Sequence, residues 1–297
     1  MKNYIAFDIG GSSVKFGIIN EQGEILDKGA FETPKEELDM IFTKMVEVVD
    51  TYKKYMKLEG IALSCPGAVN NEEGVIYGAS AVPYIHGPNF RNILKAATDL
   101  DVAMENDANC AALAEVWKGA AKDNHNVLFL ICGTGIGGAI IKDRKLHLGV
   151  NLHGGEFGYM IMESDMEKGT VRNYSEVAST FSIVRRVAEY KNIATSKIDG
   201  KKIFDMAKEG DKDCLRAIDK FYYKLALGIF NLQYVYDPEV IVIGGAISAR
   251  EDLVHCINTK LEIILKQAEI TKIMPNVKKC VYSNDANLIG AVYNFIN

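Results

Sequence analysis

Two stretches of the chain place glycines and hydroxyl side chains at a turn between two apolar runs. Residues 5–20 have the sequence IAFDIGGSSVKFGIIN, and residues 128–143 have the sequence LFLICGTGIGGAIIKD. Glycines let a phosphate approach the backbone closely, and successive N–H groups in such a turn can point at one anion. The pair therefore predicts two phosphate-binding turns that hold one nucleotide, which is a pattern typical of a kinase.

The first turn also carries an acid that could hold a metal ion. Its predicted phosphate-binding residues are Gly10, Gly11, Ser12 and Ser13. Asp8 precedes them at the end of a strand pattern, where a carboxylate can bind Mg²⁺ directly or through water. The alternative is that Asp8 only stabilises the turn, as Asp often does before glycines. Lys15 either contacts the terminal phosphate or faces solvent.

The second turn has no matching acid. Its predicted phosphate-binding residues are Gly133, Thr134, Gly135 and Gly137. Gly133, Gly135 and Gly138 also satisfy the dinucleotide pattern G-x-G-x-x-G, but that pattern requires the glycines to open a helix. Residues 139–141 instead continue as a strand, and no lysine completes a Walker motif. A phosphate-binding hairpin is therefore favoured over a Rossmann site and over a plain glycine-rich hairpin.

Further acids could act on a sugar. Asn106 and Asp107 stand where a strand pattern meets a helix pattern, a position at which both residue types are favoured caps. At the mouth of a cleft, Asp107 could instead accept the proton of an attacking hydroxyl as a general base. Glu156 and Glu176 lie in glycine-rich or loop settings and could bind vicinal hydroxyls. Glu176 could equally be an ordinary acid in the first turn of a helix.

Size and composition limit the classes of protein that this chain can be. At 297 residues it is long enough for two domains. The net charge of −5 and the dispersed basic residues argue against nucleic-acid binding. No segment of about 20 apolar residues could span a bilayer, and no signal-like stretch opens the chain, so we expect a cytoplasmic protein without membrane partners. The six cysteines form no C-x-x-C pair that would indicate a zinc site.

The elements that must position these residues repeat along the chain. Strands are predicted at 4–9, 14–20 and 24–31, and again at 127–132, 137–142 and near 145–148. A strand at 239–243 enters Gly244 and Gly245. Thr33 is the expected N-cap of the first helix, with Glu36 completing a capping box. We expect one domain from 1–118 plus about 283–297 and a second from 119–282.

Several motifs in order resemble those of the ROK family (repressors, open reading frames, kinases), over essentially the whole chain. Residues 8–15 are similar to the family's first phosphate motif, with Ser12 where threonine is usual, and residues 133–138 to its second. Residues 65–69 resemble the sugar-side Pro-Gly turn, which contains Gly67, and residues 105–109 the motif of the catalytic base. Residues 243–245 resemble the adenosine-side turn, and residues 285–291 the closing helix.

The resemblance implies a fold and an activity. The fold class is α/β: two RNase-H-like domains of the actin and hexokinase superfamily, with an active-site cleft between the sugar and phosphate domain and the nucleotide-binding and dimerisation domain. The implied reaction is in-line transfer from ATP, with Mg²⁺, to a primary hydroxyl of a small-molecule sugar, commonly in a homodimer. Asp107 would be the catalytic base, Asn106 and Gly67 would bind sugar, and Gly244 and Gly245 would contact adenosine.

Two departures from the family pattern bear on the substrate. The G-E-x-G-H motif appears as residues 155–159 with Tyr159 in place of histidine, and the cysteine-rich zinc loop is absent. We therefore expect no structural zinc. Because this region lies near the anomeric end of the sugar in relatives, its change favours a β-glucoside kinase that converts cellobiose to cellobiose 6′-phosphate.

Other functions are alternatives to that assignment. An N-acetylmannosamine kinase or a glucokinase would use the same motifs on a single sugar. A sugar-responsive ROK transcriptional regulator is the non-enzyme alternative, although such regulators carry a substantial N-terminal helix-turn-helix and here the phosphate strand begins at Tyr4. A heat-shock or actin-like ATPase would need a further domain or polymer-sized insertions.

Overall fold

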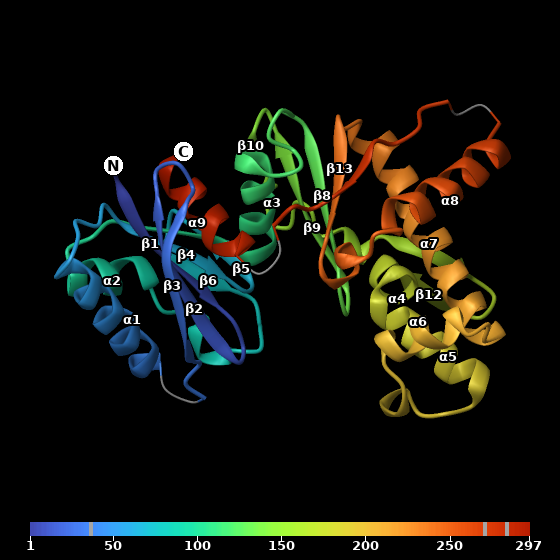
Figure 1. The fold of residues 1–297 in the computed structure, drawn as a ribbon, viewed down its shortest axis with the longest axis horizontal. Coiled ribbons are helices and arrows are strands. Elements are labelled where there is room, and N and C mark those ends of the chain that lie inside the picture. Colours follow the sequence, from blue (N-terminus) through green and yellow to red (C-terminus); the bar gives the residue numbers. More distant parts are fainter. Residues whose placement is uncertain (36–37, 270–271, 283–284) are drawn as a thin grey trace. The chain divides into compact units, whose positions relative to one another are not determined.

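The structure, a computed structural model, describes residues 1–35, 38–269, 272–282 and 285–297. It contains two compact units (Figure 1). Unit 1 comprises Met1–Asp123, Leu148–Gly154 and Val281–Asn297, and unit 2 comprises Asn124–His147 and Gly155–Cys280. The functional division predicted for 1–118 with 283–297 and for 119–282 stays a prediction, and positions 283–284 lie outside the described residues. No helix in the described ranges combines the length and apolar character that a membrane span requires.

Unit 1 is built on a five-stranded mixed sheet of order β3-β2-β1-β4-β7. The strands are β1 (Asn3–Ile9), β2 (Ser13–Asn20), β3 (Ile25–Glu32), β4 (Ile61–Cys65) and β7 (Val102–Asn106). The first three pair antiparallel, whereas β1, β4 and β7 run parallel. The carboxyl ends of these three parallel strands therefore meet at one edge of the sheet, where α/β proteins commonly bind ligands.

Helices cover both faces of this sheet. They are α1 (Leu38–Lys53), α2 (Phe90–Thr98), α3 (Asp107–Lys118) and α9 (Ala286–Ile296), with a short hairpin of β5 (Ala68–Asn70) and β6 (Val75–Tyr77) and a turn η1 (Pro83–Ile85). Ile5 and Phe7 join the core that α1 and α2 cover. Tyr4 points to the other face, where its ring lies 5.3 Å from that of Phe295 in α9. A Cβ on Gly290 would overlap the Cys110 carbonyl, so α9 and α3 pack backbone to backbone.

Unit 2 repeats the same sheet, in the order β10-β9-β8-β13-β14. Its strands are β8 (Val127–Cys132), β9 (Ile136–Lys142), β10 (Lys145–Leu146), β13 (Val240–Gly244) and β14 (Val277–Lys279). The hairpins β1–β2 and β8–β9 hold equivalent places in the two sheets. The sequence echo between residues 5–20 and 128–143 thus reflects a repeated structure, and the α/β prediction with two like domains is confirmed.

The helices of unit 2 pack on this sheet in one continuous core, which includes Leu128, Leu130 and Ile241. The remaining elements are η2 (Phe157–Tyr159), β11 (Ile161–Asp165), β12 (Thr170–Asn173), α4 (Tyr174–Ala178), α5 (Thr180–Lys191), η3 (Thr195–Lys197), α6 (Gly200–Lys208), α7 (Lys212–Tyr236), η4 (Ala246–Ala249) and α8 (Leu253–Gln267).

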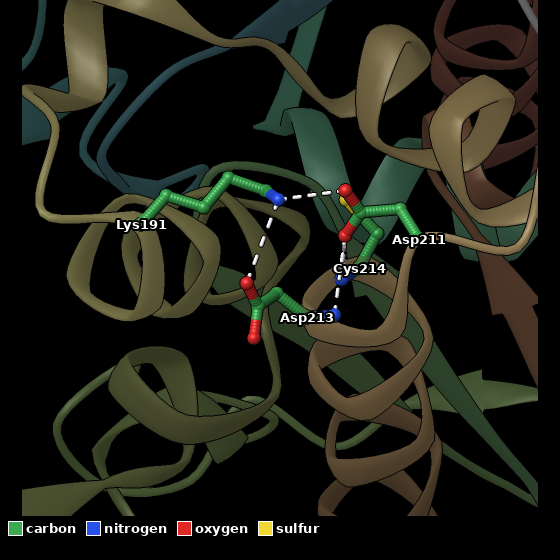
Figure 2. Close-up of polar contacts among 4 residues, drawn as sticks. All are labelled: Lys191, Asp211, Asp213 and Cys214. Carbon is green, nitrogen blue, oxygen red and sulfur yellow. Dashed lines mark hydrogen bonds and ion pairs between the residues drawn. The ribbon is translucent and has the colours of Figure 1, made fainter.

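An ion pair joins the end of α5 to the start of α7 (Figure 2). Lys191 Nζ lies 2.7 Å from Asp211 Oδ2 and 3.5 Å from Asp213 Oδ2. The other Asp211 oxygen caps α7, because it accepts the N–H groups of Asp213 and Cys214 at 3.1 and 3.0 Å. The hydrogen bond from Lys191 and that from the Cys214 backbone lower the pKa of Asp211 to about 2. Asp211 is therefore ionised, and it fixes the two helices to each other.

The predicted start of the first helix is wrong. Helix α1 begins at Leu38, and Glu36 lies outside the described residues. Thr33 does not cap the helix; its hydroxyl donates to the Gly10 carbonyl at 2.6 Å and its N–H donates to the Ser12 carbonyl at 3.1 Å. A favourable cap residue is instead used to close the glycine turn that is predicted to bind phosphate.

Candidate functional site

The first glycine turn is tightly fixed by its own backbone. The Gly10 N–H donates to the Ser13 carbonyl at 3.1 Å. A Cβ on Gly10 would lie 2.9 Å from that oxygen, and one on Gly11 would lie 3.0 Å from the Ala81 Cβ. Gly11 and Ser12 are exposed at the tip of the turn, between the paired strands β1 and β2. Their N–H groups and the serine hydroxyl are therefore the donors that this turn offers to an anion.

Asp8 is held by side chains from two distant elements. It is only 8% exposed, and its Oδ1 accepts hydrogen bonds from Ser64 Oγ in β4 at 2.8 Å and from Asn287 Nδ2 in α9 at 3.0 Å. Its Oδ2 lies 4.0 Å from Lys15 Nζ. These partners lie outside the turn, so the interpretation of Asp8 as a residue that merely stabilises its own turn is not what the structure shows.

The surroundings of Asp8 fit Mg²⁺ better than a metal held entirely by protein. Within the described ranges, no group of three or more His, Cys, Asp or Glu side chains could hold a metal ion. Mg²⁺ usually keeps several waters and takes one or two carboxylates together with substrate phosphates. A single orientated carboxylate beside a phosphate turn is compatible with that mode of binding.

Asn106, rather than Asp107, caps helix α3. Asn106 Oδ1 accepts the N–H groups of Ala108 and Asn109 at 2.9 and 3.2 Å, while its Nδ2 donates to the Gly67 carbonyl at 3.0 Å. Gly67 has a φ of +101°, and a Cβ there would lie 2.9 Å from the Tyr77 carbonyl oxygen. The predicted sugar-side turn and the predicted base motif are thus joined by a direct hydrogen bond.

Asp107 is the first residue of α3, and its Oδ1 accepts the Ala108 N–H at 2.8 Å. Burial is the main cause that raises the pKa of Asp107, and the negative charge of Asp8 raises it further. Neighbouring Glu105 is buried, and its Oε1 accepts hydrogen bonds from the Asn106 N–H and from Asn109 Nδ2. A carboxylate with a raised pKa at the carboxyl edge of a sheet is a candidate general base.

The second glycine turn leaves open space where side chains would stand. A Cβ on Gly133 or Gly137 would meet no atom within 4 Å, and neither residue has a positive φ. Packing and backbone conformation therefore give no reason for glycine at either position, whereas the predicted close approach of a phosphate would be one. The Gly133 carbonyl accepts the N–H and the hydroxyl of Thr180 at 2.9 and 2.7 Å, which fixes the turn. Thr134 is exposed at its tip.

Ser175 ties the loop of residues 155–159 to this second turn. Its Oγ accepts the Ile136 N–H at 2.9 Å. A Cβ on Gly158 would overlap the Ile136 carbonyl and the Ser175 hydroxyl, so the loop lies directly on β9. Glu156 is exposed, as is Tyr159 with 70% of its surface. The structure thus brings the predicted substrate residues Glu156 and Tyr159 beside the second phosphate turn.

Glu176 belongs to a capping box at the start of α4. Its Oε2 accepts the Asn173 N–H at 2.8 Å, and Asn173 Oδ1 accepts the Glu176 N–H at 2.9 Å. The alternative that Glu176 is an acid in the first turn of a helix therefore describes its position correctly. Glu176 and Thr134 also line one pocket of about 180 Å³, so its predicted role in substrate binding remains open to test.

Gly244 and Gly245 have structural reasons to be glycine. A Cβ on Gly244 would lie 2.7 Å from the Phe129 ring, and one on Gly245, whose φ is +84°, would overlap the Cys132 carbonyl. The end of β13 therefore touches the residue that precedes the second phosphate turn. A role in adenosine binding stays a prediction for these two glycines.

Sequence reasoning missed three residues that organise these groups: Ser64, Asn287 and Ser175. Ser64 is a polar residue in the otherwise apolar buried strand β4, which is a signal that could have been used. Asn287 lies 279 positions from the aspartate that it contacts, and Ser175 lies 39 positions from Ile136. No local pattern indicates either pairing.

Comparisons with known proteins agree with the motifs and the fold. The ROK family profile matches residues 4–297. The chain is 34% identical to a β-glucoside kinase of Klebsiella pneumoniae, over 98% of this chain and 95% of that protein. It is 32% identical to a glucokinase of Halalkalibacterium halodurans, over 84% and 82%. A ROK family protein from Streptococcus pneumoniae TIGR4, solved in complex with sucrose, superposes with a TM-score of 0.90 at 39% identity, covering 99% and 98% of the chains.

Proposed function

The chain belongs to the ROK family, and we propose that it is an ATP-dependent sugar kinase that phosphorylates the 6-hydroxyl of β-glucosides. The preferred acceptor is cellobiose, and the product is cellobiose 6′-phosphate. The observation that carries the proposal is the Asp107 carboxylate, whose pKa is raised by burial and by Asp8 and which lies one residue from the Asn106–Gly67 hydrogen bond. Burial also raises the pKa of Glu105, but that side chain is buried and bonded to Asn106 and Asn109. Asp107 is partly exposed at the start of α3, which is the position that a general base needs.

In this proposal the residues of unit 1 prepare the acceptor. Asp107 accepts the proton of the 6-hydroxyl as its oxygen attacks phosphorus, and Asn106 orients the sugar. Asp8, held by Ser64 and Asn287, would hold Mg²⁺ directly or through water. Bound Mg-ATP would supply the phosphoryl group, with the metal neutralising charge on the phosphates. The two glycine turns offer N–H and hydroxyl donors to the phosphate chain.

The choice of a β-glucoside rests on the relatives and on the rebuilt region near Tyr159. One relative is named a β-glucoside kinase, and another was solved with a disaccharide bound. By its resemblance to the family, this chain has residues 172–179 in place of the zinc loop, and neither these residues nor the ribbon β11–β12 just before them contains a cysteine. We therefore propose an enzyme without a structural zinc. Glucokinase activity is the second candidate, since a glucokinase also matches at 32% identity.

Steady-state turnover on three sugars tests the proposal. The purified enzyme is given Mg-ATP with cellobiose, glucose or N-acetylmannosamine, and ADP formation is followed. We expect the highest kcat/KM on cellobiose. No activity on cellobiose beside strong activity on either monosaccharide would refute the β-glucoside assignment, and no activity on any sugar would refute the kinase.

A further inference from the structure

The imidazole of His86 packs against the glycine turn that is predicted to bind the sugar. His86 directly follows η1 in unit 1 and is partly exposed. A Cβ on Gly67 would lie 3.1 Å from His86 Cε1 and 2.9 Å from the Tyr77 carbonyl oxygen. Gly67 has a φ of +101°, and glycine is the residue with the greatest backbone freedom. The imidazole and the carbonyl therefore restrict a turn that would otherwise be free to change conformation.

The Gly67 turn in its own right orients a side chain beside the candidate base. The Gly67 carbonyl accepts a hydrogen bond from Asn106 Nδ2 at 3.0 Å. Asn106 caps α3, whose first residue is Asp107. A change in the direction of the Gly67 carbonyl would therefore move the Asn106 amide next to Asp107. All of these residues belong to unit 1.

A serine fixes the orientation of the imidazole. Ser80 Oγ and His86 Nε2 share a hydrogen bond at 2.9 Å, and Ser80 Oγ also accepts the Val82 N–H at 3.2 Å. The Gly87 N–H donates to the Ile76 carbonyl at 3.2 Å, which ties the residue after His86 to β6. Side chain and backbone thus both hold the imidazole against the Gly67 turn.

The second ring nitrogen of His86 gives no structural reason for a histidine. His86 Nδ1 is buried, and it has no hydrogen-bond partner among the described residues. A buried polar atom without a partner lowers the stability of a fold, whereas an apolar side chain would avoid that cost. Stability alone therefore does not favour histidine here. The contacts that do require it are those of Nε2 with Ser80 and of the ring with Gly67.

We propose that His86 is a positioning residue for the acceptor sugar. Held by Ser80 through Nε2, its ring fixes the Gly67 turn, and the Gly67 carbonyl fixes Asn106 beside Asp107. His86 acts through these groups and needs no contact with the sugar. The inference rests on the proposed function, in which Asn106 orients the acceptor, and it holds equally for a hexose and a hexoside.

Three variants of His86 separate the parts of its side chain. His86→Gln places an amide about where Nε2 lies, so it can keep the hydrogen bond to Ser80. His86→Asn is shorter, ends about where Nδ1 lies and loses that bond, and His86→Leu has no polar atom. Tyr77→Phe is the matched control, because it removes only a hydroxyl that donates to Glu73 from the same hairpin and keeps the backbone carbonyl.

Steady-state kinetics with Mg-ATP, on whichever of glucose or cellobiose the wild type turns over better, is the test. We expect His86→Asn and His86→Leu to raise KM for the acceptor about two- to tenfold, as loss of one hydrogen bond does. KM for ATP should stay unchanged, and kcat should change less than KM for the acceptor. His86→Gln and Tyr77→Phe should resemble the wild type, and calorimetric melting of each variant reports its folding.

A double-mutant cycle checks that the effect passes through Ser80. Ser80→Ala should also raise KM for the acceptor, and Ser80→Ala combined with His86→Asn should be no worse than the more impaired single variant, because both changes remove the same contact. Fully additive effects would overturn the inference.

The other outcomes are equally decisive. Unchanged KM for the acceptor in His86→Asn and His86→Leu, with or without a lower melting temperature, would show a merely structural residue and overturn the inference while leaving the kinase intact. An equal rise of KM in His86→Gln would also overturn it, because the bond to Ser80 would then not be what matters. A wild-type enzyme inactive on every sugar would refute both this inference and the proposed function.

Discussion

Replacing Gly137 by alanine tests whether this position requires glycine for nucleotide binding or for the stability of the fold. Gly137 lies in β9 opposite Ile131 and has no positive φ, and a Cβ at this position would meet no atom within 4 Å. The substitution should therefore leave the free energy of unfolding unchanged or raise it by about 0.4–1 kcal/mol, because alanine restricts the unfolded chain. The fold alone gives no reason to expect a loss.

Nucleotide binding should respond in the opposite direction. A methyl group at this position would keep a phosphate away from the turn and cost one hydrogen bond to a charged group, about 1.5–3 kcal/mol. At about 1.4 kcal/mol for each factor of ten, KM for ATP should rise about ten- to hundredfold. Calorimetric melting and ATP titration of the same preparation measure both quantities.

Gly138→Ala is the matched control. A Cβ at Gly138 would overlap the Phe129 carbonyl and lie 2.6 Å from the Phe157 ring, so this variant should lose about 1–3 kcal/mol of stability by overpacking. If Gly137→Ala bound ATP as well as the wild type, the assignment of the second turn to phosphate would be wrong. The same conclusion would follow if it were destabilised as strongly as Gly138→Ala.

Substitutions at three further positions test the roles of acids. Asp107→Asn should lower kcat about 10²–10⁴-fold. Because burial raises the pKa of Asp107, the ionised carboxylate destabilises the fold at neutral pH. The variant should therefore melt at a higher temperature than the wild type in calorimetry. Asp211→Asn should have a lower melting temperature than the wild type at pH 7, because the folded protein lowers the pKa of Asp211 to about 2. The ionised Asp211 stabilises the fold fully above the ordinary pKa of aspartate, and this stabilisation is lost as the pH falls towards 2. The melting temperatures of the two proteins should therefore converge near pH 2. Glu115→Ala should lower the free energy of unfolding by about 3 kcal/mol or more, since buried Glu115 accepts the N–H groups of Ala120, Val281 and Tyr282; Glu115→Gln, which keeps an acceptor oxygen, should lose less in urea denaturation.

The sequence predicted the hairpins and parallel strands because their signals are local. Apolar runs bounded by glycine turns placed β1 and β2 within one residue of their observed ends. Elements of only a few residues escaped prediction, among them the hairpin β5–β6 and the ribbon β11–β12. Thr33 shows a second limit: a good N-cap residue was used elsewhere, because a tertiary contact to Gly10 competed with the local signal.

The candidate site likewise has features that the sequence predicted and features that it did not. The residue types at Asp8, Asp107 and the glycine turns indicated phosphate transfer, because few other chemistries need that combination. The partners that orient Asp8 could not be predicted, since Ser64 and Asn287 reach it only after the sheet has formed. The space beside Gly137 and the pocket that Glu176 and Thr134 line are likewise properties of packing, which no spacing along the chain displays.

The central claim concerns which oxygen receives the phosphate. The enzyme is incubated with Mg-ATP and cellobiose, and the carbon that bears the phosphate in the product is identified by ³¹P–¹H correlation NMR. The account predicts a single product in which phosphorus couples to the C6 methylene protons of the non-reducing glucose ring. Phosphate on a secondary hydroxyl would contradict the proposed position of Asp107 as the base for a primary hydroxyl, and phosphate on the reducing ring, or a product mixture, would contradict the assignment of cellobiose 6′-phosphate as the product.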